Sequence, residues 1–353
     1  MARSTTKELT SGSPMKLILG FAVPLLFGML FQQFYSLMDT IIVGRYLGVT
    51  ALAAVGATGS INFLIIGFCQ GICNGFGLPV AQRFGARDYD GVRKYVGNSA
   101  ILSVLIGGVL TALTVIFCRQ ILVLMQTPSD IIDLSYNYIV VIFAGIPATI
   151  LYNILSSYLR SLGDSITPVI FLIVAAVLNI GLDLLFVVGF HWGIRGAAAA
   201  TVVSQYIAGI GILLYVVVSQ PGRAAGETME SQKSQQKGML REGFDPVIMK
   251  EIITLSSLTC LQQSVMNFGI LMVQGLVNSF RATTMAAFAA AVKIDTFAYL
   301  PVQDFGNAYS TFVAQNYGVK DYGRIQKGTK EAFAISIVFS IIISIRCARL
   351  QHL

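Results

Sequence analysis

Acidic and amide side chains inside apolar segments are the residues of this chain best placed to do chemistry. Asp39 lies in the apolar run SLMDTIIVG, and Asp183 lies in NIGLDLLF. A charge at the centre of a bilayer costs at least about 2.5–3.5 kcal/mol, so such residues need a functional reason. Asn179 precedes Asp183 by four residues and therefore shares its helix face. Two carboxylates and an amide are the first candidates for binding a cation.

A hydroxyl and a second amide follow in the next apolar run, AAAATVVSQY, where Gln205 lies one turn after Thr201. All these groups offer oxygen, which suits Na⁺, and two carboxylates in a low-dielectric setting also suit a bound proton. The pattern predicts a cation site at Asp39, Asn179, Asp183 and Thr201, with Na⁺ and H⁺ both open. Two structural alternatives remain: Asp39 as a solvated helix end, and Thr201 as a helix-packing hydroxyl.

Matching polar pairs occur in two distant parts of the chain. Gln70 and Asn74 are four residues apart, as are Gln303 and Asn307, so each pair marks one helix face. We predict that these faces line a cavity or an interface between two halves. Hydrogen bonding between helices is the structural alternative.

Lys293, Asp295 and Asp304 are further charged residues in an apolar run. Lys293 and Asp295 are two residues apart and do not face each other on one helix. We expect Lys293 to pair either with a bound substrate or with another helix. Lys293 and Asp295 therefore join Gln205 and the two polar pairs as candidates for lining a cavity.

The polar pairs belong to an internal repeat. Residues 80–89 read VAQRFGARDY and residues 313–322 read VAQNYGVKDY, with six of ten positions identical at an offset of 233. The same offset relates Gln70 to Gln303 and Asn74 to Asn307. In a membrane protein, an internal duplication is typical of two-lobed transporters that bind substrate between their repeats.

Composition indicates a membrane protein. The chain is 55% hydrophobic and 12% charged, whereas soluble domains carry about 25% charged residues. The net charge of +7 resides in short loops between apolar runs, which argues against nucleic-acid binding. Cys69 and Cys73 are four residues apart in an apolar run and predict a packed pair rather than a bridge. No nucleotide-binding, zinc or Ser-His-Asp pattern is present, so we expect neither an enzyme nor a cofactor.

Apolar runs long enough to span a bilayer, of about 20 residues, organise the chain. We predict an all-α bundle of nine segments, at about 17–43, 54–80, 97–117, 132–158, 167–190, 197–218, 251–277, 284–314 and 332–345. Prolines interrupt several of them: Pro24 lies in the first, Pro147 in the fourth and Pro301 in the eighth. Each predicts a kink, either static or changing during transport.

The basic residues predict the orientation. The loops on the side of the N-terminus hold 17 Lys and Arg residues, among them Arg160 in the loop between the fourth and fifth segments, and the opposite loops hold 4. The positive-inside rule therefore places the N-terminus in the cytoplasm. Six segments, an even number, separate the two copies of the repeat, so we expect a parallel repeat about an axis along the membrane normal.

The segments predict a division into parts: a cytoplasmic tail at 1–14, a six-helix lobe at 15–218, a cytoplasmic linker at 219–246, a partial second lobe of three helices at 247–345 and a tail at 346–353. The tail, RCARLQHL, is expected to continue no helix. A full second copy would end near residue 452, so about 99 residues are expected to be missing. We expect the 353-residue protein to insert into the membrane but not to export compounds.

The chain resembles a known family. The run PLLFGMLFQQFYSLMDTIIVGRYLG, the segment LAAVGATGSI, the VAQRFGARDY loop and the Asn179–Asp183 pair are similar to the MATE multidrug and toxic compound extrusion transporters, in particular the DinF-like branch. The resemblance implies twelve helices in two six-helix lobes. It also implies export of mostly cationic, amphipathic organic compounds in exchange for Na⁺ or H⁺ across the cell (inner) membrane.

The resemblance assigns roles to individual residues. It implies that Asp39 is the first-helix acid of the cation site, completed by Asn179, Asp183 and Thr201. Tyr35 matches a position that lines the same cavity, and Pro24 matches the proline at which the first helix bends. The implied partners are small organic substrates and membrane lipids, and the protein is expected to be a monomer.

Two other functions stay open. A related flippase for a lipid-linked precursor would show a broader cationic lining in its cavity, whereas the intramembrane charges of the first lobe are acidic. A non-transporting remnant or scaffold is the alternative from a different class.

Overall fold

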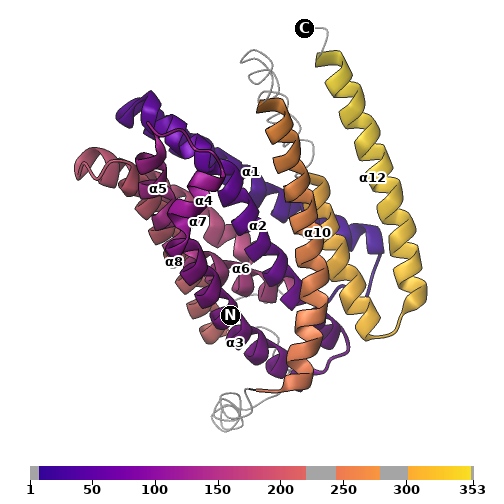
Figure 1. The fold of residues 1–353 in the computed structure, drawn as a ribbon. Helices are drawn as coiled ribbons and strands as arrows, with labels where there is room; N and C mark the ends of the chain where they lie inside the picture. The colour runs from indigo at the N-terminus through magenta and orange to yellow at the C-terminus, as the bar shows by residue number, and fades with distance from the viewer. Residues whose placement is uncertain (1–7, 220–243, 279–300, 351–353) are drawn as a thin grey trace.

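The fold is a bundle of long helices. The structure is a computed structural model that describes residues 8–219, 244–278 and 301–350, in which all regular elements are helices (Figure 1). The all-α class predicted from the sequence is therefore confirmed. The helices of the N-terminal part are α1 (Pro14–Leu47), α2 (Val49–Gly85), α3 (Tyr89–Ile116), α4 (Cys118–Leu124), α5 (Ile132–Ala144), α6 (Ile146–Ser161), α7 (Ile166–Asp183), the π-helix η1 (Leu184–Gly189) and α8 (Ile194–Ser219).

The C-terminal part contributes α10 (Pro246–Asn278), a helix over 301–318 and α12 (Tyr322–Leu350). These boundaries follow the nine predicted segments, although the first 17 residues of the eighth segment lie outside the described residues. The expectation that the tail continues no helix is wrong, because α12 runs to Leu350. Residues 346–350 contain Arg, Ala and Leu, which are good helix formers, and no Gly or Pro to stop the helix.

Within the described residues, five helices are long and apolar enough to span a membrane, and six if the bent pair α5 and α6 counts as one span. The bend of 43° falls at Gly145, two residues before Pro147. Proline disfavours helical geometry in the residue before it and lacks the N–H that would continue the helix. The predicted interruption at Pro147 is therefore present.

The outer faces of these helices are apolar. Phe27, Leu30, Phe34 and Leu37 of α1 are all at least half exposed. A soluble protein rarely leaves such a continuous apolar face uncovered, whereas a bilayer would cover it at no cost. The fold therefore has the exterior of a membrane protein.

Close packing of α2 on α10 joins the N-terminal and C-terminal parts (Figure 1). Gly67, Gly71 and Gly75 repeat every four residues along the face of α2 that meets α10. A Cβ at Gly71 would lie 3.0 Å from Cα of Cys260. Thr259 Oγ1 donates a 2.9 Å hydrogen bond to the Gly71 carbonyl oxygen. Small residues at this spacing let two backbones approach closely, as is usual between helices in membranes.

Candidate functional site

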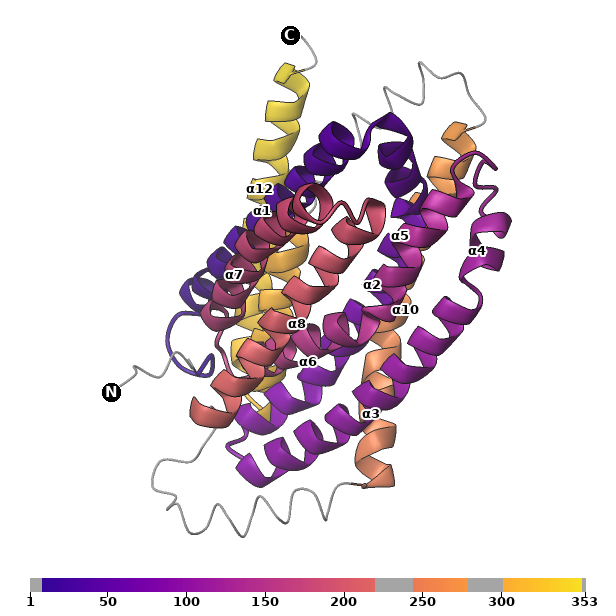
Figure 2. The same cartoon turned by 90° about the vertical axis from the view of Figure 1, so that its left-hand side faces the viewer.

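Three neighbouring helices, α1, α7 and α8, carry the predicted cation ligands (Figure 2). Asn179 and Asp183 lie on one face of α7 and are buried, with 1% and 0% of their surface exposed. Asn179 Nδ2 donates to Thr201 Oγ1 of α8 at 3.3 Å, and Thr201 in turn donates to the Ala197 carbonyl at 3.3 Å. The spacing of four residues in the sequence therefore does place Asn179 and Asp183 together on a buried face of α7.

Asp39 of α1 completes this cluster from the facing helix. It is half-buried, and its charge interacts electrostatically with that of Asp183. Four oxygens of the cluster are buried without a hydrogen-bond partner among the described residues: Asp39 Oδ1, Asn179 Oδ1 and both carboxylate oxygens of Asp183. Buried oxygens normally have partners, so four unmet acceptors in one place are what the chemistry of a cation site requires. We call Asp39, Asn179, Asp183 and Thr201 the acidic cluster.

Of the four residues of the acidic cluster, two are acids and two are neutral. No group of three or more His, Cys, Asp or Glu side chains that could hold a metal ion occurs in the described part of the chain. Two carboxylates, an amide and a hydroxyl are hard oxygen donors, which fit an alkali cation or a proton better than a transition metal. The role of these residues as ligands stays a prediction.

The backbone changes immediately after Asp183. The chain passes from the α-helix α7 into the π-helix η1, where Phe190 N–H bonds to the Leu185 carbonyl at 2.8 Å. Short π-helical turns are rare and occur preferentially at functional sites. Beyond η1, the ring of Trp192 stacks on Phe186 with centroids 4.8 Å apart. The single tryptophan of the chain therefore lies on the segment that directly follows the acidic cluster.

Tyr138 of α5 is a member of this neighbourhood that the sequence analysis missed. It is 7% exposed and interacts electrostatically with Asp39, Asp183 and Tyr35. The only signal in the sequence is a tyrosine inside an apolar run, and a buried tyrosine hydroxyl usually needs a polar partner.

A cavity of about 140 Å³ that opens to the outside lies beside the acidic cluster. Its walls come from α1, α2, α6, α7, α8, α10 and the helix at 301–318. Six of the eight predicted cavity residues line it, namely Tyr35, Gln70, Asn74, Gln205, Gln303 and Asn307. The other two, Lys293 and Asp295, lie outside the described residues. Asn179 also lines the cavity and so connects it to the acidic cluster.

Hydrogen bonds between helices hold part of the polar lining. Thr149 Oγ1 of α6 donates to Gln205 Oε1 of α8 at 2.6 Å. Gln303 Nε2 donates to Gln263 Oε1 of α10 at 3.4 Å. Gln303 therefore lines the cavity and also bonds between helices, which are the two interpretations that the sequence left open for its pair.

Arg160 is placed differently from the expectation. The apolar runs predict that it lies in a loop between helices, but it lies in the last turn of α6 and its side chain lines the cavity. Arg160 Nη2 donates to Asn74 Oδ1 at 3.0 Å. Asp304, a charged residue for which the sequence predicts no role, lines the same cavity.

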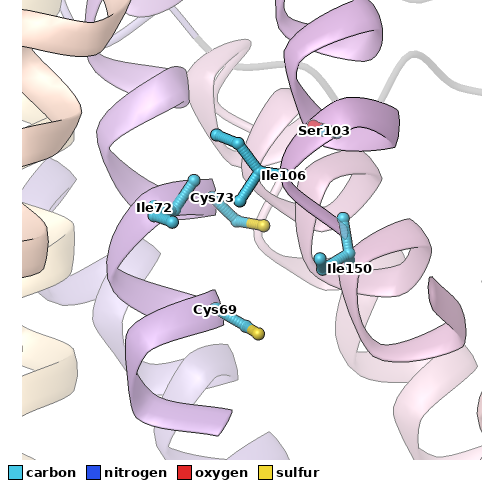
Figure 3. Close-up of a pocket in the computed structure, with 6 residues that line it drawn as sticks. All are labelled: Cys69, Ile72, Cys73, Ser103, Ile106 and Ile150. Carbon is cyan, nitrogen blue, oxygen red and sulfur yellow. The ribbon is translucent and has the colours of Figure 1, made fainter. Parts of the chain in front are cut away.

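A second, small pocket contains the cysteine pair. Cys69 and Cys73 of α2 point into the space between α2, α3 and α6, which Ile72, Ser103, Ile106 and Ile150 also line (Figure 3). Both cysteines are buried and unbridged, as predicted. The lining is almost entirely apolar, so these thiols act as small hydrophobic side chains in the core.

The chain matches a family model and is similar to two probable multidrug resistance proteins. Residues 24–185 and 258–349 match the family model MatE. The chain is 30% identical over 315 residues to the probable multidrug resistance protein YoeA of Bacillus subtilis (strain 168), covering 87% of this chain and 65% of YoeA. It is 28% identical to the probable multidrug resistance protein YpnP of the same organism, covering 90% of this chain and 68% of YpnP. The chain thus spans about two thirds of the length of these relatives.

Solved structures show the same fold. A MOP superfamily transporter from Pyrococcus furiosus Vc1 (DSM3638) superposes with a TM-score of 0.84 at 24% identity, covering 97% of this chain and 73% of the other. The family model covers Asp39, Asn179 and Asp183 of the acidic cluster, and also the C-terminal helices that complete the cavity. By this match over more than half of its length, the chain belongs to the MatE family.

Proposed function

We propose that this protein is a secondary antiporter that exports organic, mostly cationic and amphipathic compounds in exchange for Na⁺ or H⁺. The observation that carries the proposal is the position of the acidic cluster beside the cavity, with Asn179 belonging to both. The names of the relatives YoeA and YpnP, which describe probable multidrug resistance proteins, support the direction and class of transport.

Helix α1 supplies a physical route for coupling. It carries Asp39 of the acidic cluster and also Gln32 and Tyr35 of the cavity wall. A cation that neutralises the two interacting carboxylates would change the force between α1 and α7, and so would alter the cavity wall that a substrate contacts. Pro24 within α1 removes one helical hydrogen bond, which makes this helix easier to bend.

The cavity fits this function better than it fits a flippase for an anionic lipid-linked precursor. Among the described residues that line it, Arg160 is the only basic one and Asp304 the only acidic one. A cavity for a polyanionic precursor would need several basic side chains.

Several finer assignments are part of the proposal. They are the DinF-like branch, the two-lobed arrangement with a parallel repeat, the cytoplasmic N-terminus in a cell membrane and a monomeric state. The family match and the repeat at an offset of 233 support the arrangement. No cofactor is required, because an ion gradient supplies the energy for exchange.

Export of a fluorescent cationic dye from vesicles tests the function. The assay uses a version of the protein with a complete second repeat and an imposed Na⁺ or pH gradient. We expect gradient-driven export in the wild type and loss of export in Asp39→Asn. Asp130→Asn, which changes an exposed acid in the loop before α5, is the matched control and should behave as wild type. Wild-type export by Asp39→Asn would exclude the proposed coupling site.

A further inference from the structure

Two opposite charges face the cavity from the two parts of the chain. Arg160 reaches it from α6, and Asp304 reaches it from the helix at 301–318. Their charges interact electrostatically. These two described residues nevertheless form no ion pair, unlike Arg83 and Asp88, whose charged atoms lie 3.5 Å apart. Each charge is therefore available to a group that enters the cavity.

Arg160 is oriented but far from saturated. One amine of its guanidinium donates to Asn74 Oδ1 at 3.0 Å, and Asn74 itself lines the cavity. A guanidinium carries five N–H donors in a planar fork that matches the two oxygens of a carboxylate or phosphate. Held on one side by Asn74, this fork is suited to bind an anionic group from the cavity.

Asp304 has the complementary need. Only 4% of its surface is exposed, and its Oδ2 has no hydrogen-bond partner among the described residues. A buried carboxylate oxygen without a donor is costly, and a cation or a donor from a ligand would remove that cost. Asp304 also lies one helical turn before Asn307, another residue of the cavity lining.

We propose that Arg160 and Asp304 form a two-ended subsite for compounds that carry an anionic and a cationic group on one molecule. Arg160, held by Asn74, binds the carboxylate or phosphate, and Asp304 binds the organic cation. The inference rests on the proposed function and narrows its substrate class from cations to zwitterions. Because the two charges come from the two parts of the chain, a bound zwitterion would also bridge them.

A pair of dyes that differ at one group tests the subsite. Rhodamine 110 carries a free carboxylate and a delocalised cation, and rhodamine 123 is its methyl ester, which keeps the cation alone. Binding of each dye to the purified protein in detergent is measured by fluorescence anisotropy. The variants are Arg160→Gln, Arg160→Lys and Asp304→Asn. Arg119→Gln is the control, because Arg119 pairs with Asp133 on the surface at 3.1 Å, away from the cavity.

We expect Arg160→Gln to weaken rhodamine 110 binding about tenfold or more and to leave rhodamine 123 within about twofold, because only the free carboxylate uses the guanidinium. Arg160→Lys should recover part of the lost affinity, since it restores the charge without the fork. Asp304→Asn should weaken the binding of both dyes, because both carry the cation.

The same set of binding measurements is repeated with added phosphatidylethanolamine, whose headgroup is also a zwitterion. Competition that depends on Arg160 would identify a lipid headgroup as the occupant of the subsite.

The outcomes separate the subsite from the proposed function. Equal loss of both dyes in Arg160→Gln, or no loss of either, would refute the subsite while leaving the transporter in place. Failure of the wild-type protein to bind either dye would count against both the subsite and the proposed export of organic cations. A variant that no longer elutes as a single folded species is replaced by Asn74→Ala, which removes the hydrogen bond that orients the guanidinium. It should weaken rhodamine 110 in preference to rhodamine 123, and an equal effect on the two dyes would again refute the subsite.

Discussion

Gly85 of α2 packs directly against the backbone of Gln315. Gly318 packs in the same way against the backbone of Gln82. Gly85 corresponds to Gly318, and Gln82 to Gln315, at the repeat offset of 233. The contact is therefore reciprocal, as in the two-fold interface of a homodimer. At both glycines a Cβ would collide with backbone atoms. The two copies of the repeat thus meet where α2 and the helix at 301–318 end.

Substitution at this contact should destabilise the protein. Gly85→Ala places a Cβ against the Gln315 carbonyl, where no flexible side chain can move aside. We expect a loss of about 1–3 kcal/mol in the free energy of unfolding, the usual cost of overpacking. Thermal unfolding in detergent measures it. Gly97→Ala is the control, because nothing lies within 4 Å of that position in α3 and alanine favours a helix. Equal stability of both variants would show that the repeats do not depend on this contact.

Cation binding at the acidic cluster should be visible through Trp192. This residue follows η1, which begins directly after Asp183, so a change at the carboxylates should alter its stacking on Phe186. We expect Na⁺ or a change of pH to shift the tryptophan fluorescence of the wild-type protein. Asp183→Asn should weaken that response about tenfold or more, because it removes one of two interacting charges.

The matched control for Asp183→Asn is Asp130→Asn, which alters an exposed acid in the loop before α5. An unchanged titration in Asp183→Asn would show that the acidic cluster does not hold the ion.

The predicted orientation can be tested with single cysteines. The four cysteines with described side chains are buried, so they should react slowly with a membrane-impermeant maleimide. Asp90→Cys lies at the start of α3, beside the basic loop, and should label only in broken cells. Val49→Cys lies at the start of α2, where the wild-type side chain is 81% exposed, and should label in intact cells. The reverse pattern would invert the predicted topology.

The sequence by itself determined the class, the helices and the local part of the site. The apolar runs matched the helices because a spanning segment must be about 20 residues long and apolar throughout. Asn179 and Asp183 were placed correctly because residues four apart share a helix face, whatever surrounds the helix. The repeat offset also paired Gln70 with Gln303, and both residues line the cavity.

The tertiary structure decided the contacts between helices that are distant in the chain. Arg160 was expected in a loop because it ends an apolar run, but the long side chain reaches the cavity and bonds to Asn74, 86 residues earlier. Tyr138 joins the acidic residues only because α5 packs on α8, which in turn packs on α7. Gly85 and Gln315 meet only because α2 and the helix at 301–318 end at the same place. Helical periodicity is a local property of the chain, whereas these contacts depend on how whole helices pack, which no short pattern encodes.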